Sequence, residues 1–307
     1  MNGERPLATL SLDRCLACGS SDFGSLPLRY EYRDASFPLA VCRGCGMRFL
    51  RVQPNGDGLA ELYRAPYFER DFRCGRSAGS SFHEAAFRDE NRGLLDAFAR
   101  LGPPGRLLEI GSAAGWLLKH ARERGWQVQG VELSAEAAAH AHALGLDVFH
   151  GELGAAGLPA DHFDLVYMGD VLEHVPDCRA ALAEVVRVLA PGGHLFLRGP
   201  ITTNSLARRL ALGLYGLAGR SIVLREPPYH LWEFTPPSLV RLCRAVGFEV
   251  VELRESKISP GRTHGQKRAH ERLVMGALDA VNLPLTALVN RWGDRIVLVA
   301  RKLASPR

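Results

Sequence analysis

The sequence has no run of about 18 uninterrupted apolar residues, although 47% of its 307 residues are hydrophobic. A membrane-spanning helix needs a stretch of roughly that length, so no such helix is expected. The first residues, Met1 to Pro6, lack the apolar core of a secretory signal, which favours a cytoplasmic location. Lysine is also scarce, since only four of the 38 basic residues are Lys.

Cysteine, in contrast, is clustered. Four of the seven cysteines form two C-x-x-C pairs, Cys15 with Cys18 and Cys42 with Cys45. Two such pairs supply the four thiolates that Zn²⁺ prefers in a tetrahedral structural site. A disulfide is disfavoured in a reducing compartment, and a redox motif is disfavoured because neither pair opens a helix. The sequence therefore predicts a zinc ribbon over residues 1–50.

The charge of this ribbon bears on its partner. Residues 1–50 contain six Arg and five acidic residues, so their net charge is close to zero. Nucleic-acid binding needs a positive field that neutralises several phosphates. The ribbon is therefore predicted to be structural or to shape a substrate site, and nucleic acid is a disfavoured partner.

The most informative stretch begins at Leu107. An apolar run that includes Glu109 leads into the small-residue turn 111–115 and then into a helical pattern that starts at Trp116. Small residues let a backbone approach a ligand closely, and the first turn of a helix offers unpaired N–H groups. A dinucleotide fingerprint would need Gly where Trp116 stands, which argues against a bound pyrophosphate.

Later segments extend this pattern. The run 127–132 reads as a second strand that ends in Glu132, an acid able to accept hydrogen bonds from ribose hydroxyls. The runs F-D-L-V at 163–166, L-E-H at 172–174 and R-V-L-A-P-G-G at 187–193 follow. Together with E-x-G-x-A-x-G at 109–115, where Ala113 replaces a Gly, they resemble class I methyltransferases that use S-adenosylmethionine (SAM). The resemblance covers about residues 80–305.

The resemblance implies an α/β fold: a seven-stranded Rossmann-like sheet with helices on both faces, joined to the small N-terminal ribbon. The expected domains are the ribbon at 1–50, an irregular linker that covers the cofactor at 51–80, and a methyltransferase domain at 81–307. Helical insertions are expected at 204–228 and 257–293. We expect the ribbon and the methyltransferase domain to have separate cores.

The resemblance also implies a set of site residues. The cofactor-binding residues are Glu109, Gly111, Ser112, Ala113, Gly115, Glu132, Leu133, Glu152, Leu153 and Asp170. The glycine-rich turn would hold the methionine part, Glu132 the ribose, and Leu133 with Glu152 the adenine. His174 and His230 are candidates for the base that takes a hydroxyl proton, with Asp170 nearby. A packing role for either histidine remains open.

Three functions compete at this stage. The first is methylation of oxygen or carbon on a small-molecule, sugar or lipid-linked acceptor. The second is methylation of RNA, with the ribbon contacting nucleic acid, and the third is SAM binding without catalysis. The sequence defines neither the acceptor nor the oligomeric state.

A Leu-rich segment at 205–220 carries three Arg and no acid. Such a segment suits a lid over the acceptor, a helix that lies in a membrane interface, or an ordinary packed helix. Residues 254–307 contain eleven basic and four acidic residues. Basic residues near the acceptor side favour an anionic acceptor or surface.

Overall fold

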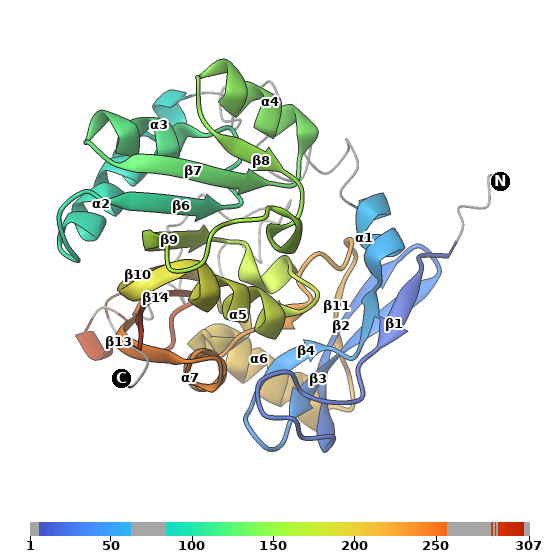
Figure 1. Ribbon diagram of the computed structural model, residues 1–307. Helices are drawn as coiled ribbons and strands as arrows, with labels where there is room; N and C mark the ends of the chain where they lie inside the picture. Colours follow the sequence, from blue (N-terminus) through green and yellow to red (C-terminus); the bar gives the residue numbers. More distant parts are fainter. Residues whose placement is uncertain (1–5, 63–83, 257–283, 285, 287, 304–307) are drawn as a thin grey trace.

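The computed structural model describes residues 6–62, 84–256, 284, 286 and 288–303. A seven-stranded sheet forms the larger part of the molecule, and a five-stranded sheet lies beside it (Figure 1). No described helix has both the length and the apolar character needed to cross a membrane.

The seven-stranded sheet has the order β13-β14-β10-β9-β6-β7-β8. Only β14 runs antiparallel to its neighbours β10 and β13, and the other pairs are parallel. The predicted seven-stranded α/β sheet is therefore confirmed. Its strands are β6 (Arg106–Ile110), β7 (Gln127–Glu132), β8 (Val148–His150), β9 (Phe163–Gly169), β10 (Leu189–Pro200), β13 (Phe248–Ser256) and β14 (Arg295–Lys302).

Both faces of this sheet are buried, because successive apolar side chains point to opposite sides. Leu107 and Leu165 belong to one core cluster with residues of α2 and α3. Leu108 and Val166 belong to another cluster with residues of α5 and α7. The helices are α2 (Arg88–Ala99), α3 (Trp116–Glu123), α4 (Ala135–Ala143), α5 (Cys178–Val188) and α7 (Pro236–Ala245).

The N-terminal region forms the five-stranded sheet, in the order β11-β2-β3-β4-β12. Its strands are β2 (Phe23–Tyr32), β3 (Ala35–Cys42), β4 (Arg48–Leu50), β11 (Ile222–Leu224) and β12 (Trp232–Glu233). The outer two strands, β11 and β12, come from the segment that follows β10. This sheet therefore combines N-terminal strands with strands of the segment that follows β10 of the larger sheet.

Residues 51–62 are not the irregular linker that the sequence predicted. They form β5 (Val52–Pro54), which pairs antiparallel with β1 (Thr9–Ser11), and then α1 (Gly56–Leu62). The partner strand lies some forty positions earlier in the chain, so its pairing left no local signal. The rest of the segment expected to cover the cofactor, 63–80, lies outside the described residues.

The expectation of separate cores is wrong. Phe49 of β4 packs against Trp232 of β12, with ring centroids 5.7 Å apart. The indole N–H of Trp232 donates to the Val175 carbonyl at 2.7 Å, which ties β12 to the larger sheet's loops. One continuous cluster contains Cys15, Cys42 and Phe49 together with side chains of α5 and α7. The cores merge because β11 and β12 complete the N-terminal sheet.

The insertion expected to be helical at 204–228 is only partly so. It contains α6 (Leu206–Leu217), whose N-terminus Ser205 caps, and then the strand β11. α6 contacts β2 of the N-terminal sheet and lies behind it in Figure 1. Most of the second expected insertion, residues 257–283, lies outside the described part of the chain.

Candidate functional site

The turn after β6 has left-handed backbone angles at three positions and no room for a side chain at Gly111. Gly111 and Gly115 have φ angles of 74° and 83°, and Ala113 has a φ of 46°. A Cβ atom at Gly111 would lie 2.4 Å from Cγ2 of Val171, in the loop after β9. The left-handed conformation at Ala113 costs about 1–2 kcal/mol for a residue with a side chain. The turn is thus held in a strained shape typical of ligand-binding loops.

Two buried polar atoms of this turn have no hydrogen-bond partner within the described residues: Oε2 of Glu109 and Oγ of Ser112. Glu109 is 6% exposed and Ser112 is 3% exposed. Burial, together with the neighbouring charge of Glu132, raises the pKa of Glu109 well above its usual range. A buried group left without a partner costs about 1–3 kcal/mol. These two atoms are therefore ready to bind a polar ligand.

Glu132 at the end of β7 faces the same turn. One of its oxygens accepts from the Ala113 N–H at 2.8 Å, and the other accepts from the Ser134 N–H at 2.7 Å. Burial raises the pKa of Glu132, and these N–H bonds oppose that rise. Leu133 follows with 49% of its surface exposed. Each carboxylate oxygen can accept a second bond, so Glu132 can hold the turn and a ligand together.

Asp170 lies directly after β9 with a φ of 57°, and its N–H donates to the Arg198 carbonyl. Its carboxylate accepts two bonds from Nη2 of Arg295, at 2.8 and 2.7 Å. Asp170 thus forms an ion pair with the guanidinium of Arg295, the first residue of β14. Glu152 and Leu153 lie after β8, where the Gly151 N–H donates to the Glu132 carbonyl.

The structure brings His174 and His230 together, although they lie 56 positions apart in the chain. Their rings are edge to face with centroids 4.9 Å apart. Nδ1 of His174 donates to the Tyr229 carbonyl at 3.0 Å. Burial and the nearby charge of His230 lower the pKa of His174 to about 3. His174 is therefore neutral at physiological pH, with its remaining ring lone pair on Nε2.

Two carboxylates flank this histidine pair. Burial disfavours the charged form of His230, but Glu233 and Glu173 outweigh that effect and raise the pKa of His230 to about 8. Burial, and next the charge of Asp170, raises the pKa of Glu173 to about 8. Glu233 lies 3.8 Å from Nδ1 of His230 and accepts from the Thr202 hydroxyl at 2.9 Å. The pair is thus set in an acidic, buried surrounding.

The N-terminal sheet borders this group. Burial, followed by the charge of Glu233, raises the pKa of Tyr30 in β2 well above its usual range. Two strands away in the same sheet, Arg48 in β4 donates to the Thr203 carbonyl at 2.9 Å. Tyr30 and Arg48 therefore place the N-terminal sheet next to the histidine pair.

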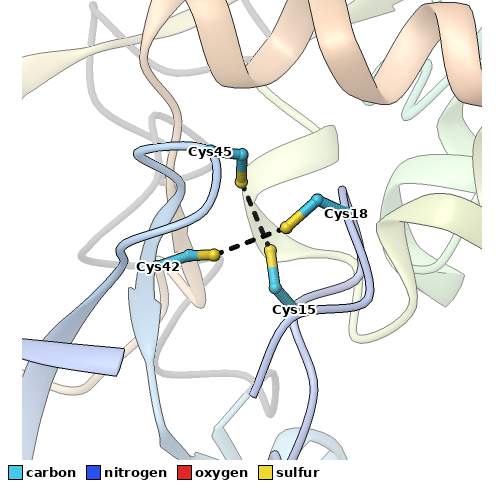
Figure 2. A group of neighbouring side chains, drawn as sticks. All are labelled: Cys15, Cys18, Cys42 and Cys45. Atoms are coloured by element: carbon cyan, nitrogen blue, oxygen red, sulfur yellow. Dashed lines mark hydrogen bonds between the residues drawn. The ribbon is translucent and has the colours of Figure 1, made fainter. Parts of the chain in front are cut away.

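The four predicted cysteines do converge. Cys15 Sγ lies 3.6 Å from Cys45 Sγ, and Cys18 Sγ lies 3.4 Å from Cys42 Sγ (Figure 2). All four sulfur atoms lie within 4.8 Å of one another. Four sulfurs bound to one Zn²⁺ at about 2.3 Å would be roughly 3.8 Å apart. The thiols thus have the number and spacing that a tetrahedral metal site needs.

Sequence reasoning missed Glu173, Glu233 and Arg295. Glu173 is part of the L-E-H run and directly precedes His174, so its position was a usable signal. Glu233 follows His230 by three positions, which is another local signal. Arg295 carried none, because its contact with Asp170 spans 125 positions and depends on the pairing of β14 with β10.

Residues 82–253 match the sequence model of a family described as a methyltransferase domain. The chain therefore belongs to this methyltransferase family, and it is a SAM-dependent methyltransferase. Among curated proteins it is similar to the ubiquinone biosynthesis O-methyltransferase of Cupriavidus pinatubonensis, with 28% identity over 179 residues. That alignment covers 55% of this chain and 69% of the relative.

The corresponding enzyme of Aromatoleum aromaticum is 28% identical over 166 residues, which cover 50% of this chain and 68% of the relative. Among solved structures, a SAM-dependent methyltransferase from Archaeoglobus fulgidus matches with a TM-score of 0.50 and 16% identity. The match covers 76% of this chain and 98% of that one. At this identity the likeness supports the fold alone.

Proposed function

We propose that this chain transfers the methyl group of SAM to a hydroxyl oxygen of a small-molecule acceptor. The cofactor would lie over the turn after β6, at the carboxyl ends of the parallel strands, where open α/β sheets bind ligands. Cofactor contacts are assigned to the set named from the sequence: Glu109, Gly111, Ser112, Ala113, Gly115, Glu132, Leu133, Glu152, Leu153 and Asp170.

The observation that carries this proposal is the unpartnered, buried oxygen of Glu109. SAM carries an ammonium group at its methionine end, and a buried carboxylate is stabilised by such a cation. The Oγ of Ser112 adds a second unused polar atom in the same turn. At the other end of the site, Glu132 keeps acceptor capacity for ribose hydroxyls. The residues present therefore fit the cofactor.

Methyl transfer from a sulfonium is an in-line displacement, so the protein mainly has to align the acceptor oxygen with the methyl group. His174 and His230 lie after β9 and before β12, on the acceptor side of this arrangement. Of the two, His230 is the better candidate for the base, because its pKa of about 8 lies near physiological pH, whereas a pKa of about 3 makes His174 a weak base. The names of the curated relatives support O-methylation, whereas the near-neutral ribbon disfavours RNA as the acceptor.

The experiment is a product assay with SAM and three acceptor classes: phenols, sugar nucleotides and short RNA. We expect S-adenosylhomocysteine and a singly methylated phenol, with the methyl carbon shown by NMR to be bonded to oxygen. A product methylated on carbon, or turnover of RNA alone, would contradict the proposal. Formation of no product with any acceptor, by protein that binds S-adenosylhomocysteine, would favour a SAM-binding protein without catalysis.

We also infer that Cys15, Cys18, Cys42 and Cys45 hold one structural Zn²⁺. The sulfur spacing supports this, and so does burial, which raises the pKa of Cys15 to about 11. Thiols in such a setting remain protonated unless a cation stabilises the thiolates. A metal would therefore supply the charge that the buried cluster lacks.

α6 is proposed as an acceptor-side element that touches an anionic membrane surface. α6 exposes Leu214 and Leu217, which are 67% and 90% exposed, and Arg209 is exposed nearer the start of the helix. Burial raises the pKa of Glu233, but His230 outweighs that effect, and the charge of Arg208 in the first turn of α6 adds a smaller lowering. This end of α6 therefore lies close to the histidine pair. An apolar face with basic residues and no acid is typical of interfacial helices.

The α6 proposal predicts that the double variant Leu214→Ser, Leu217→Ser binds vesicles of anionic phospholipid at least about tenfold more weakly than wild type. Cosedimentation measures the binding, and affinity for S-adenosylhomocysteine should stay unchanged. Val251→Ser, which alters an exposed apolar residue of β13, is the matched control. If the wild type does not sediment with the vesicles, α6 is an ordinary packed helix.

A further inference from the structure

Three side chains of metal-binding type meet beside the 3-10 turn η4 (Leu172–His174): Glu173, His174 and His230. One ligand atom from each lies within 4.8 Å of the others. Nε2 of His174 lies 3.8 Å from Oε1 of Glu173. Two atoms bonded to one ion at about 2.0–2.2 Å can be no more than roughly 4.4 Å apart. The cluster is thus within a small side-chain movement of a coordination site.

The far side of each imidazole is already oriented. The Tyr229 carbonyl accepts the Nδ1–H of His174, and Glu233 lies 3.8 Å from Nδ1 of His230. Histidines that bind metals commonly direct one nitrogen to the ion and donate the other N–H to a carbonyl or carboxylate. Thr202 in turn donates to Glu233. This arrangement directs the Nε2 atom of both rings to the ion.

Glu173 supplies an independent indication. It is 2% exposed, and its Oε1 has no hydrogen-bond partner in the part of the chain that the structure describes. This oxygen is the one that faces Nε2 of His174. An unpartnered carboxylate oxygen is unusual in a folded protein unless it has a ligand. A cation between Glu173 and the two rings would complete its coordination.

We propose that Glu173, His174 and His230 bind a divalent transition-metal ion of the zinc type, at a site separate from the cysteine cluster. Two imidazoles and one carboxylate leave at least one coordination position for a further ligand. Glu233 is a positioning residue in this site, since it acts on the ion through His230.

The role of the ion rests on the proposed function. Val171, two positions before Glu173, packs against Gly111 of the cofactor turn, so the site adjoins the cofactor. The acceptor hydroxyl oxygen would fill the open position, which lowers the pKa of that hydroxyl. With both imidazoles bound to the ion, neither of them takes the proton, which passes to water instead. An oxygen electron pair forms the bond to the methyl carbon, and the S–CH₃ bond breaks with its electrons remaining on sulfur.

The test uses the whole chain loaded with one equivalent of zinc, which the four thiolates hold, and titrates it with Co²⁺ while its visible absorption is followed. Co²⁺ binds more weakly than Zn²⁺ to a given site, so it leaves zinc-filled thiolates in place. Any cobalt in the cysteine cluster would show a thiolate charge-transfer band, which a site of imidazole and carboxylate lacks. We expect one equivalent of bound Co²⁺ without that band.

Three variants locate the ion. Glu173→Gln and His230→Gln should weaken Co²⁺ binding by more than about 100-fold, and Glu233→Gln by about 10–100-fold. His142→Gln, whose ring contacts the Val148 carbonyl far from η4, is the matched control and should bind as wild type does. S-adenosylhomocysteine affinity, measured for each variant, shows that it is folded.

The absence of cobalt absorption in the wild type would overturn the proposal, and so would wild-type cobalt affinity in His230→Gln. If cobalt binds as expected but no acceptor is methylated, the metal site stands and the proposed function fails. If acceptors are methylated equally well without a bound ion, the site is not part of the methyl transfer.

Discussion

Cys42→Ser is expected to lose the ribbon metal and to reduce acceptor turnover by about 100-fold. Zinc binding contributes roughly 10–16 kcal/mol in small zinc-finger peptides, so loss of one ligand loosens the fold that it holds. Here that fold includes β4, which pairs with β12 and packs against Trp232. Misplacement of reacting groups by about 1 Å can cost about 100-fold in rate.

Metal analysis, steady-state rates and S-adenosylhomocysteine affinity together measure this effect. The affinity should change much less than turnover, because the turn after β6 is held mainly by β7 and the loop after β9. Cys243→Ser makes the same chemical change at a buried thiol of α7, outside the cluster, and should retain the metal. If Cys42→Ser retains both its zinc and its turnover, the cluster is not a structural metal site.

Glu132→Ala is expected to weaken S-adenosylhomocysteine binding by about 10–150-fold, which corresponds to about 1.5–3 kcal/mol for a charge-assisted hydrogen-bond acceptor. The change removes the proposed bonds to the ribose and the observed bonds to the Ala113 and Ser134 N–H groups. Calorimetric titration measures the affinity.

Two further variants serve as a graded change and a control for Glu132→Ala. Glu132→Gln keeps one acceptor oxygen and should show an intermediate loss. Glu249→Ala removes an exposed carboxylate of β13 that pairs only with Arg301 among the contacts described, and should bind as wild type does. Equal affinity in Glu132→Ala and wild type would place the ribose elsewhere.

Much of the fold was predictable because its signals are local. The runs around Leu107 and Val166 are largely apolar, as strands buried on both faces of a parallel sheet require, and the run 127–132 was recognised by the acid that ends it. Small residues mark the turn at 111–115, and the positive φ angles of Gly111 and Gly115 explain why. The two C-x-x-C pairs likewise predicted a four-sulfur cluster, because metal-binding knuckles are short and local.

What escaped prediction depends on contacts between distant segments. The sequence near Ile222 or Trp232 does not predict that these residues extend an N-terminal sheet, because a strand of two or three residues is too short to show a hydrophobic pattern. The joining of the cores through Phe49 and Trp232 follows from that pairing. His174 and His230 were each identified, but their contact, and the role of Glu173 between them, arise only from the folded arrangement.

Hydrogen–deuterium exchange of the wild-type protein, with and without saturating S-adenosylhomocysteine, shows directly which segments the cofactor covers. We expect slower exchange in peptides that cover residues 109–116 and 130–134, because the cofactor would cover the turn after β6 and the end of β7. Peptides of the outer strand β13 should be unchanged. Unchanged exchange at 109–116, or protection confined to other segments, would contradict the assignment of the cofactor site.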